Sequence, residues 1–197
     1  YLPGEHDLVG IITGVVEKDK IITGETIQPG DVVLGLPSSG LHTNGYSLAR
    51  KLFFEIGRYD VKDTIPELEK SVGLTLLESH INYTNHVFAL LDAGIDVKGI
   101  AHITGGGLVE NIPRILPDGV GVEIQKESWP VLSVFKLMKK LGKIDCNEMR
   151  RTFNMGIGIV FIVDPHNVDT VENALEDLTT VYEIGSVVSG KKEVRFK

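Results

Sequence analysis

The stretch that most constrains the fold covers residues 31–54, which read as a strand, a polar loop with glycines and a helix. Residues 31–36 are a short apolar run rich in β-branched side chains, and residues 46–54 place apolar side chains at helical spacing. The polar loop therefore ends at a helix start, where unpaired N–H groups and roughly half a positive charge attract a phosphate or carboxylate. This pattern predicts an anion-binding loop.

The composition of the loop agrees with this prediction. Gly40 and Gly45 let the backbone approach an anion closely. The side chains that can donate hydrogen bonds to the anion are Ser38, Ser39, His42, Thr43 and Asn44. Under a second interpretation, Asn44 or Thr43 only caps the helix, and the glycines only serve the turn.

The same order of elements recurs after residue 96. A short apolar strand at residues 97–103 leads into a helix at residues 108–116, and the residues between them are Thr104, Gly105, Gly106 and Gly107. Successive glycines before a helix can form a nest of N–H groups for phosphate, although neither the P-loop nor the dinucleotide pattern is matched. His102 is either a core histidine or a ligand contact, and Glu110 and Asn111 either cap the helix or contact substrate. Because both loops follow strands of one expected sheet, we predict that they converge on one cleft.

The remaining pattern predicts an α+β fold, a mixed β-sheet with helices packed over it. A turn followed by a strand is expected within residues 1–16, and residues 17–20 form a charged boundary turn. The other expected elements are a helix at 74–91, a strand at 120–124, a helix from 129 to 141, a short helix at 145–151, a strand at 159–163, a helix at 165–178 and a closing hairpin of 182–188 with 193–196.

Several single residues carry expectations of their own. Trp129 is expected to anchor the core, and Asn154 lies on a glycine-flanked bend that can face the same site. Cys146 is expected to be a buried thiol, with a catalytic role as the alternative. His80 and His86 are six residues apart and so lie on different helical faces, which excludes a metal pair.

Charge and composition exclude some partners. The formal net charge is −7 with dispersed lysines and arginines, which argues against nucleic acid and acidic membranes. No apolar run reaches the roughly 20 residues of a membrane span. A lone cysteine fits a reducing compartment. Arg150 and Arg151 are expected to cover the surface, and Glu5, His6 and Asp7 are either solvated or near a metal-bound nucleotide.

Three ordered strings, at residues 38–48, 101–114 and 151–158, resemble segments of the aminoimidazole ribonucleotide synthetase family, also called phosphoribosylformylglycinamidine cyclo-ligase. The resemblance covers essentially the whole chain but only the C-terminal part of the family's polypeptide. One departure is Ser79-His80-Ile81, where the family has Pro-Thr-Arg. The role of that arginine is therefore in doubt here.

The resemblance implies the C-terminal domain of this family, with partial ferredoxin-like βαβ topology. Residues 1–18 would close an N-terminal ATP-binding domain, and residues 19–197 would form the substrate-binding domain. The implied reaction is ATP-dependent ring closure of formylglycinamidine ribonucleotide to aminoimidazole ribonucleotide in a cytoplasmic homodimer. ATP and Mg²⁺ would be held mainly by the N-terminal domain, so the chain alone would be inactive.

The resemblance assigns substrate and phosphate holding, with no catalytic residue and no metal ligand, to both loops and the late bend. These residues are Ser38, Ser39, Gly40, His42, Thr43, Asn44, Gly45, Thr104, Gly105, Gly106, Gly107 and Asn154. Two alternatives remain open: a sister enzyme such as formylglycinamidine ribonucleotide synthase, and a non-catalytic ligand-binding module.

Overall fold

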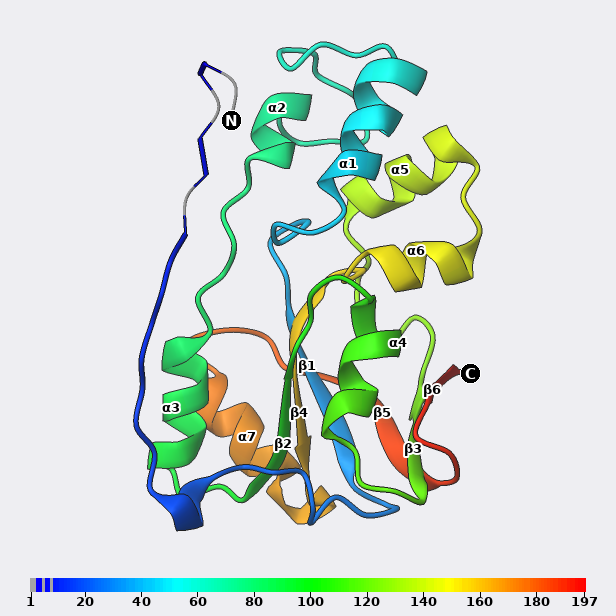
Figure 1. Ribbon diagram of the computed structural model, residues 1–197. Helices are drawn as coiled ribbons and strands as arrows, with labels where there is room; N and C mark the ends of the chain where they lie inside the picture. Colours follow the sequence, from blue (N-terminus) through cyan, green and yellow to red (C-terminus); the bar gives the residue numbers. More distant parts are fainter. Residues whose placement is uncertain (1–2, 5, 8) are drawn as a thin grey trace.

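The computed structural model describes residues 3–4, 6–7 and 9–197 (Figure 1). The strands in this part of the chain are β1 (Val32–Pro37), β2 (Val97–His102), β3 (Val120–Ile124), β4 (Ile157–Val163), β5 (Tyr182–Ser189) and β6 (Val194–Phe196). They form one sheet of order β2-β4-β1-β5-β3-β6, in which β3 and β6 are parallel and the other neighbours are antiparallel. The predicted mixed sheet and α+β class are confirmed.

Helices cover both faces of the central strands. One face packs on α3 (Thr84–Asp92) and α7 (Val168–Leu175), and the other packs on α4 (Gly107–Asn111) and the short 3₁₀ helix η3 (Ile112–Ile115) (Figure 1). Every residue of β4 is buried. A strand covered on both faces needs apolar side chains on both, which explains the continuous run of isoleucine, valine and phenylalanine in β4.

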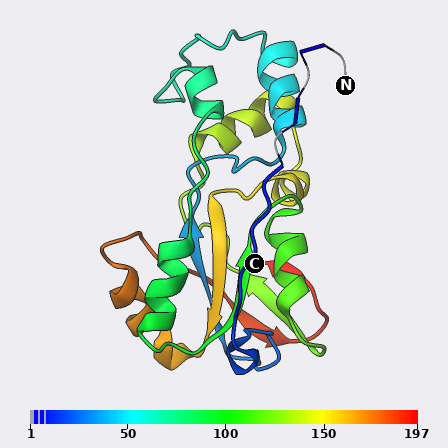
Figure 2. The same ribbon diagram turned by 60° about the vertical axis from the view of Figure 1, so that its left-hand side comes forward.

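A second group of helices lies beyond the end of the sheet where β1 and β2 finish (Figures 1 and 2). Its members are α1 (Tyr46–Arg50), the π-helical turn η2 (Lys51–Ile56), α2 (Val72–Leu76), α5 (Ser133–Gly142) and α6 (Cys146–Thr152). They share a separate core around Phe53, Phe135 and Phe153. The loops at this end of the sheet therefore lie between the two cores on the faces of the sheet and this separate core.

Two of the elements predicted after residue 73 are wrong. The single helix expected at residues 74–91 is two helices, because residues 77–83 run without helical structure between α2 and α3. Tertiary contacts hold this linker: the Tyr83 hydroxyl donates to the carbonyl of Pro37 at 2.6 Å. The expected closing hairpin is also absent from the described residues, because β3 lies between β5 and β6 and pairs with both.

The N-terminal segment is extended but pairs with no strand. Residues 9–17 have no regular structure, and Ile11 and Ile12 are 90% and 98% exposed. The strand expected there is not formed within the described residues, and Glu5 lies outside them. In Figure 1 this segment runs down the side of the picture on which α3 is drawn, and in Figure 2 it passes in front of the sheet. The division into residues 1–18 and 19–197 stays a prediction.

Candidate functional site

The two predicted loops meet. Strands β1 and β2 both pair antiparallel with β4, so they run in the same direction and end at the same edge of the sheet. The backbone N–H of Gly105 donates to the side-chain oxygen of Asn44 at 2.9 Å. The amide of Asn44 donates in turn to the carbonyl of His42 at 2.7 Å. Residues 38–45, the signature loop, and residues 104–107, the glycine loop, therefore meet as predicted, and the cleft that they were expected to share stays a prediction.

The signature loop is fastened by Asn154, which is only 2% exposed. Its side-chain oxygen accepts from the Ser38 hydroxyl at 2.9 Å and from the backbone N–H of Gly156 at 2.8 Å. Its amide donates to the carbonyl of Gly40 at 2.8 Å. Asn154 therefore satisfies the backbone of two segments at once, and its side chain is a brace within the protein.

His42 is the buried centre of the loop. The backbone N–H of Ser39 donates to its Nε2 at 3.1 Å, so this nitrogen is the acceptor and the proton of the neutral ring lies on Nδ1. Nδ1 is buried and has no hydrogen-bond partner among the described residues. Burial, with smaller contributions from His80 and His102, lowers the pKa of His42 to about 4. His42 is therefore neutral at physiological pH.

A row of rings extends from His42 to the surface. The ring of His80 stacks on His42 with 4.1 Å between ring centroids, and Nε2 of His80 lies 3.0 Å from Nε2 of His102. His102 is exposed, so it is not a core histidine. Partial loss of hydration and the neighbouring His80 lower the pKa of His102. Sequence reasoning missed this row because its members come from the signature loop, the linker before α3 and the end of β2.

The helix-capping interpretation of the signature loop is wrong. The N-cap of α1 is Gly45, in the left-handed region with φ 74°, and no side chain caps this helix. His42 and Thr43 also have positive φ, at 50° and 62°. Non-glycine residues adopt this region at some cost, and such backbone is frequent at ligand sites. The Thr43 hydroxyl donates to the carbonyl of His42 at 2.6 Å.

The glycine loop is held by a local brace. The amide of Asn111 donates to the carbonyls of Gly107 and Gly105 at 2.8 and 3.2 Å, and the Thr104 hydroxyl donates to its side-chain oxygen at 3.1 Å. Asn111 thus does not cap α4, whose N-cap is Gly106, and its side chain is bonded within the glycine loop. Gly106 has φ 96°, and a Cβ at Gly107 would lie 2.0 Å from the carbonyl oxygen of Arg150. The structure itself therefore requires glycine at two of the three positions, 106 and 107.

No cluster of three histidine, cysteine, aspartate or glutamate side chains suited to a metal is found among residues 3–4, 6–7 and 9–197. No helix in this same part of the chain is long and apolar enough to cross a membrane.

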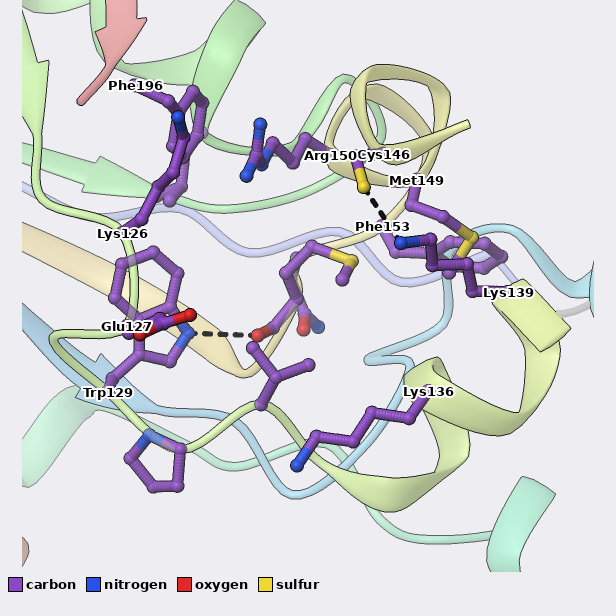
Figure 3. Close-up of a pocket in the computed structure, with 15 residues that line it drawn as sticks. Lys126, Glu127, Trp129, Lys136, Lys139, Cys146, Met149, Arg150, Phe153 and Phe196 are labelled. Carbon is purple, nitrogen blue, oxygen red and sulfur yellow. Dashed lines mark hydrogen bonds between the residues drawn. The ribbon is translucent and has the colours of Figure 1, made fainter. Parts of the chain in front are cut away.

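A cavity of about 520 Å³, the tryptophan cavity, opens behind the brace on the side of α5 and α6 (Figure 3). Trp129 is 8% exposed and belongs to the core as predicted, and it also lines this cavity. Arg150 was expected to cover the surface, but it lines the cavity. Cys146 is exposed at the start of α6, so the expectation of a buried thiol is wrong; Lys139 Nζ donates to its sulfur at 2.8 Å.

The comparison with protein families decides the identity of the fold. Residues 28–197 match the model of the C-terminal domain of AIR synthase related proteins. The chain belongs to this AIR synthase related family. A phosphoribosylformylglycinamidine cyclo-ligase of Caldanaerobacter subterraneus subsp. tengcongensis is 47% identical over 192 residues, and one of Vigna unguiculata, named chloroplastic/mitochondrial, is 43% identical over 190 residues.

These matches cover 97% and 96% of the chain but only 56% and 48% of the two relatives. The chain thus spans about half the length of the curated relatives it matches, and the matching model places it in their C-terminal portion.

Solved structures share the AIR synthase related fold at low identity. A thiamine-monophosphate kinase from Stenotrophomonas maltophilia K279a matches with a TM-score of 0.60 at 15% identity, over 92% of this chain and 54% of its own. The hydrogenase maturation protein HypE of E. coli matches with a TM-score of 0.55 at 24% identity, over 88% of this chain and 48% of its own. These neighbours support the fold alone.

Proposed function

We propose that this chain is the substrate-binding part of a ligase that uses ATP to close formylglycinamidine ribonucleotide to aminoimidazole ribonucleotide, in purine biosynthesis. The similarity along 97% of the chain to relatives named phosphoribosylformylglycinamidine cyclo-ligase carries this proposal. The junction of the signature loop with the glycine loop, where Gly105 donates to Asn44, supports a single ligand site on this domain.

In this proposal the chain holds the ribonucleotide folded, so that the amidine nitrogen lies against the activated formyl carbon. Intramolecular ring closure gains effective molarities of about 10⁵ M or more when the reacting atoms are held near attack geometry. Ser39, Thr43 and Asn44, with the N–H groups of the glycine loop, supply the polar contacts. Neutral His42 acts as a hydrogen-bonding group without charge, because its pKa lies at about 4.

The described residues include no cluster of three histidine, cysteine, aspartate or glutamate side chains that could hold a metal ion by themselves. The proposal assigns ATP and Mg²⁺ mainly to the part of the relatives that this chain does not cover. It also includes a cytoplasmic homodimer. The name of the Vigna unguiculata relative places that protein in chloroplasts or mitochondria.

A chimera tests the proposal. The matching portion of the Caldanaerobacter relative is replaced by this chain, and formation of aminoimidazole ribonucleotide is measured with ATP and Mg²⁺. We expect turnover by the chimera and none by the 197-residue chain alone. A chimera that melts cooperatively but does not turn over would contradict the proposal and favour a non-catalytic module. Turnover by the isolated chain would contradict the assignment of ATP to the uncovered part.

A further inference from the structure

The tryptophan cavity lies apart from the signature loop, and the proposed function does not use it. It is bounded by the segment before α5, by α5 and α6, and by the end of β6. The segment 153–156 lies between the two places: Phe153, Asn154 and Met155 line the cavity, and Asn154 also braces the signature loop. In Figure 1 the N-terminal segment runs along the left-hand side of the picture, whereas α5, α6 and β6 lie on the right-hand side.

The charge around the cavity is opposite to that of the chain. The protein carries 20 lysines and arginines against 27 aspartates and glutamates. The cavity is nevertheless lined by four basic residues, Lys126, Lys136, Lys139 and Arg150, and by one acidic residue, Glu127. An acidic protein that gathers cations around one hollow creates a local site for an anion.

These four cations have no ion-pair partner among the described residues. The salt bridges found there involve other lysines and arginines. Lys139 donates to the sulfur of Cys146. Arg150 donates to the side-chain oxygen of Asn147 at 3.5 Å, and its guanidinium lies 4.2 Å from the ring centre of Phe196, so both of these partners are uncharged. In Figure 3 the charged ends of Lys136, Lys139 and Arg150 point from α5 and α6 toward the side where Trp129 lies. Their charge is therefore available to a ligand.

The opposite wall is apolar and fixed. The indole N–H of Trp129 donates to the carbonyl of Met155 at 2.9 Å, which holds the ring in one orientation. Pro130, Val131 and Met155 continue this wall. A cavity of about 520 Å³ falls in the range of roughly 300–1,000 Å³ that small-molecule sites occupy. A flat ring fits against an aromatic and aliphatic wall, and several cations opposite suit a doubly charged group.

We infer that the tryptophan cavity binds a planar heteroaromatic ring that carries a phosphate group, a ligand of the size and class of a nucleoside monophosphate. The ring lies against the wall formed by Trp129, and the phosphate faces Lys136, Lys139 and Arg150. Glu127, two residues before Trp129, is placed to accept a hydrogen bond from an exocyclic amine or a ribose hydroxyl. The site is separate from ring closure, so the two proposals stand or fall independently.

The chain provides its own reporter. Trp129 is the only tryptophan in the sequence, so its fluorescence reads this cavity directly. The 197-residue chain is titrated with adenosine monophosphate, adenosine and inorganic phosphate. We expect a saturable change with the monophosphate below roughly 1 mM and binding at least about tenfold weaker for adenosine and for phosphate. A folded chain that shows no change up to about 10 mM monophosphate, or equal affinity for adenosine, would overturn the inference.

Matched variants on one helix locate the phosphate. The double variant Lys136→Gln with Lys139→Gln should bind the monophosphate at least about tenfold more weakly. Lys140→Gln, on the same helix, should stay within about twofold, because Lys140 is exposed and pairs with Glu67 at 3.1 Å. Arg150→Gln repeats the test from α6 without altering α5. Equal weakening by Lys140→Gln, or unchanged binding in both cavity variants with unchanged melting, would show that these cations do not hold the ligand.

Discussion

The signature loop and the glycine loop occupy equivalent places, each between a strand end and a helix start, but they are held differently. The signature loop is buried and braced by Asn154, a residue more than a hundred positions away. The glycine loop is more exposed and is braced by Asn111, seven residues or fewer along the chain. The first loop therefore depends on the finished tertiary structure, whereas the second depends mainly on its own sequence.

The largest effect is expected from Asn154→Ala. This change leaves the backbone N–H of Gly156 and the carbonyl of Gly40 unpaired in the interior, at about 1–3 kcal/mol for each group, so we expect a loss of about 4 kcal/mol. A thermal melt measures it as a large fall in Tm. Asn173→Ala on the exposed face of α7 is the control and should change stability by less than about 0.5 kcal/mol. A small loss at both sites would show that the brace does not hold the loop.

A pH effect follows from His42. Its pKa is about 4 in the folded chain and 6.5 when unperturbed, so the unfolded state binds more protons between these values. The contribution of neutral His42 to the free energy of unfolding is complete above pH 6.5. It is lost as the pH falls toward 4, by about 3 kcal/mol in all. Denaturant titrations of the wild type and His42→Gln at several pH values measure it. If the free energy of unfolding falls equally with pH in both proteins, a group other than His42 causes the acid sensitivity.

Asn111→Ala should have a smaller effect than Asn154→Ala. Gly105, one of its partners, is exposed, so water can replace the lost hydrogen bond there. The carbonyl of Gly107 is buried and would be left without a hydrogen-bond donor, so we expect the free energy of unfolding to fall by about 2 kcal/mol. Chemical denaturation of both alanine variants gives the ranking. A reversed order would mean that the glycine loop, rather than the signature loop, is the more demanding structure.

The smallest losses of stability are expected from alanine substitutions at two neighbouring glycines, Gly106 and Gly105. Gly106→Ala places a Cβ 2.6 Å from that of Glu110 in a residue with φ 96°, so it should cost about 1–2 kcal/mol. Gly105→Ala meets only the Asn44 oxygen at 3.5 Å and should stay within about 0.5 kcal/mol. In the chimera, a rise in substrate KM for Gly105→Ala without loss of stability would show that close approach to the ligand is what this glycine provides.

The strand–loop–helix units could be predicted because their signals are local. The apolar runs of β1 and β2, the glycines, and the meeting of the two loops follow from the sequence and from sheet geometry. The row from His42 through His80 to His102 could not, since it depends on how the linker before α3 folds back. The helix expected at residues 74–91 failed for the same reason: contacts such as Tyr83 with Pro37 outweigh local helical spacing.

The role of Asn154 was also beyond the sequence. A glycine-flanked asparagine indicates a constrained bend, but it does not show whether the side chain faces a ligand or the protein's own backbone. One sequence pattern pointed toward the tryptophan cavity: α5 carries lysines and no acidic residue. An amphipathic helix with an unbalanced basic face is usually only solvated, so the pattern becomes informative when α6 and β6 close the other sides.

The position of β1 at the centre of the sheet has a consequence for how the chain folds during synthesis. Its neighbours are β4 and β5, and Val32 pairs with Val163 and with Ser186. All the helices from α1 to α6 are therefore made before β1 meets its first partner. Until then both edges of this apolar strand are unpaired. Such late pairing slows folding, and the exposed edges can associate with other chains. The strand that leads into the signature loop is thus among the last to be paired.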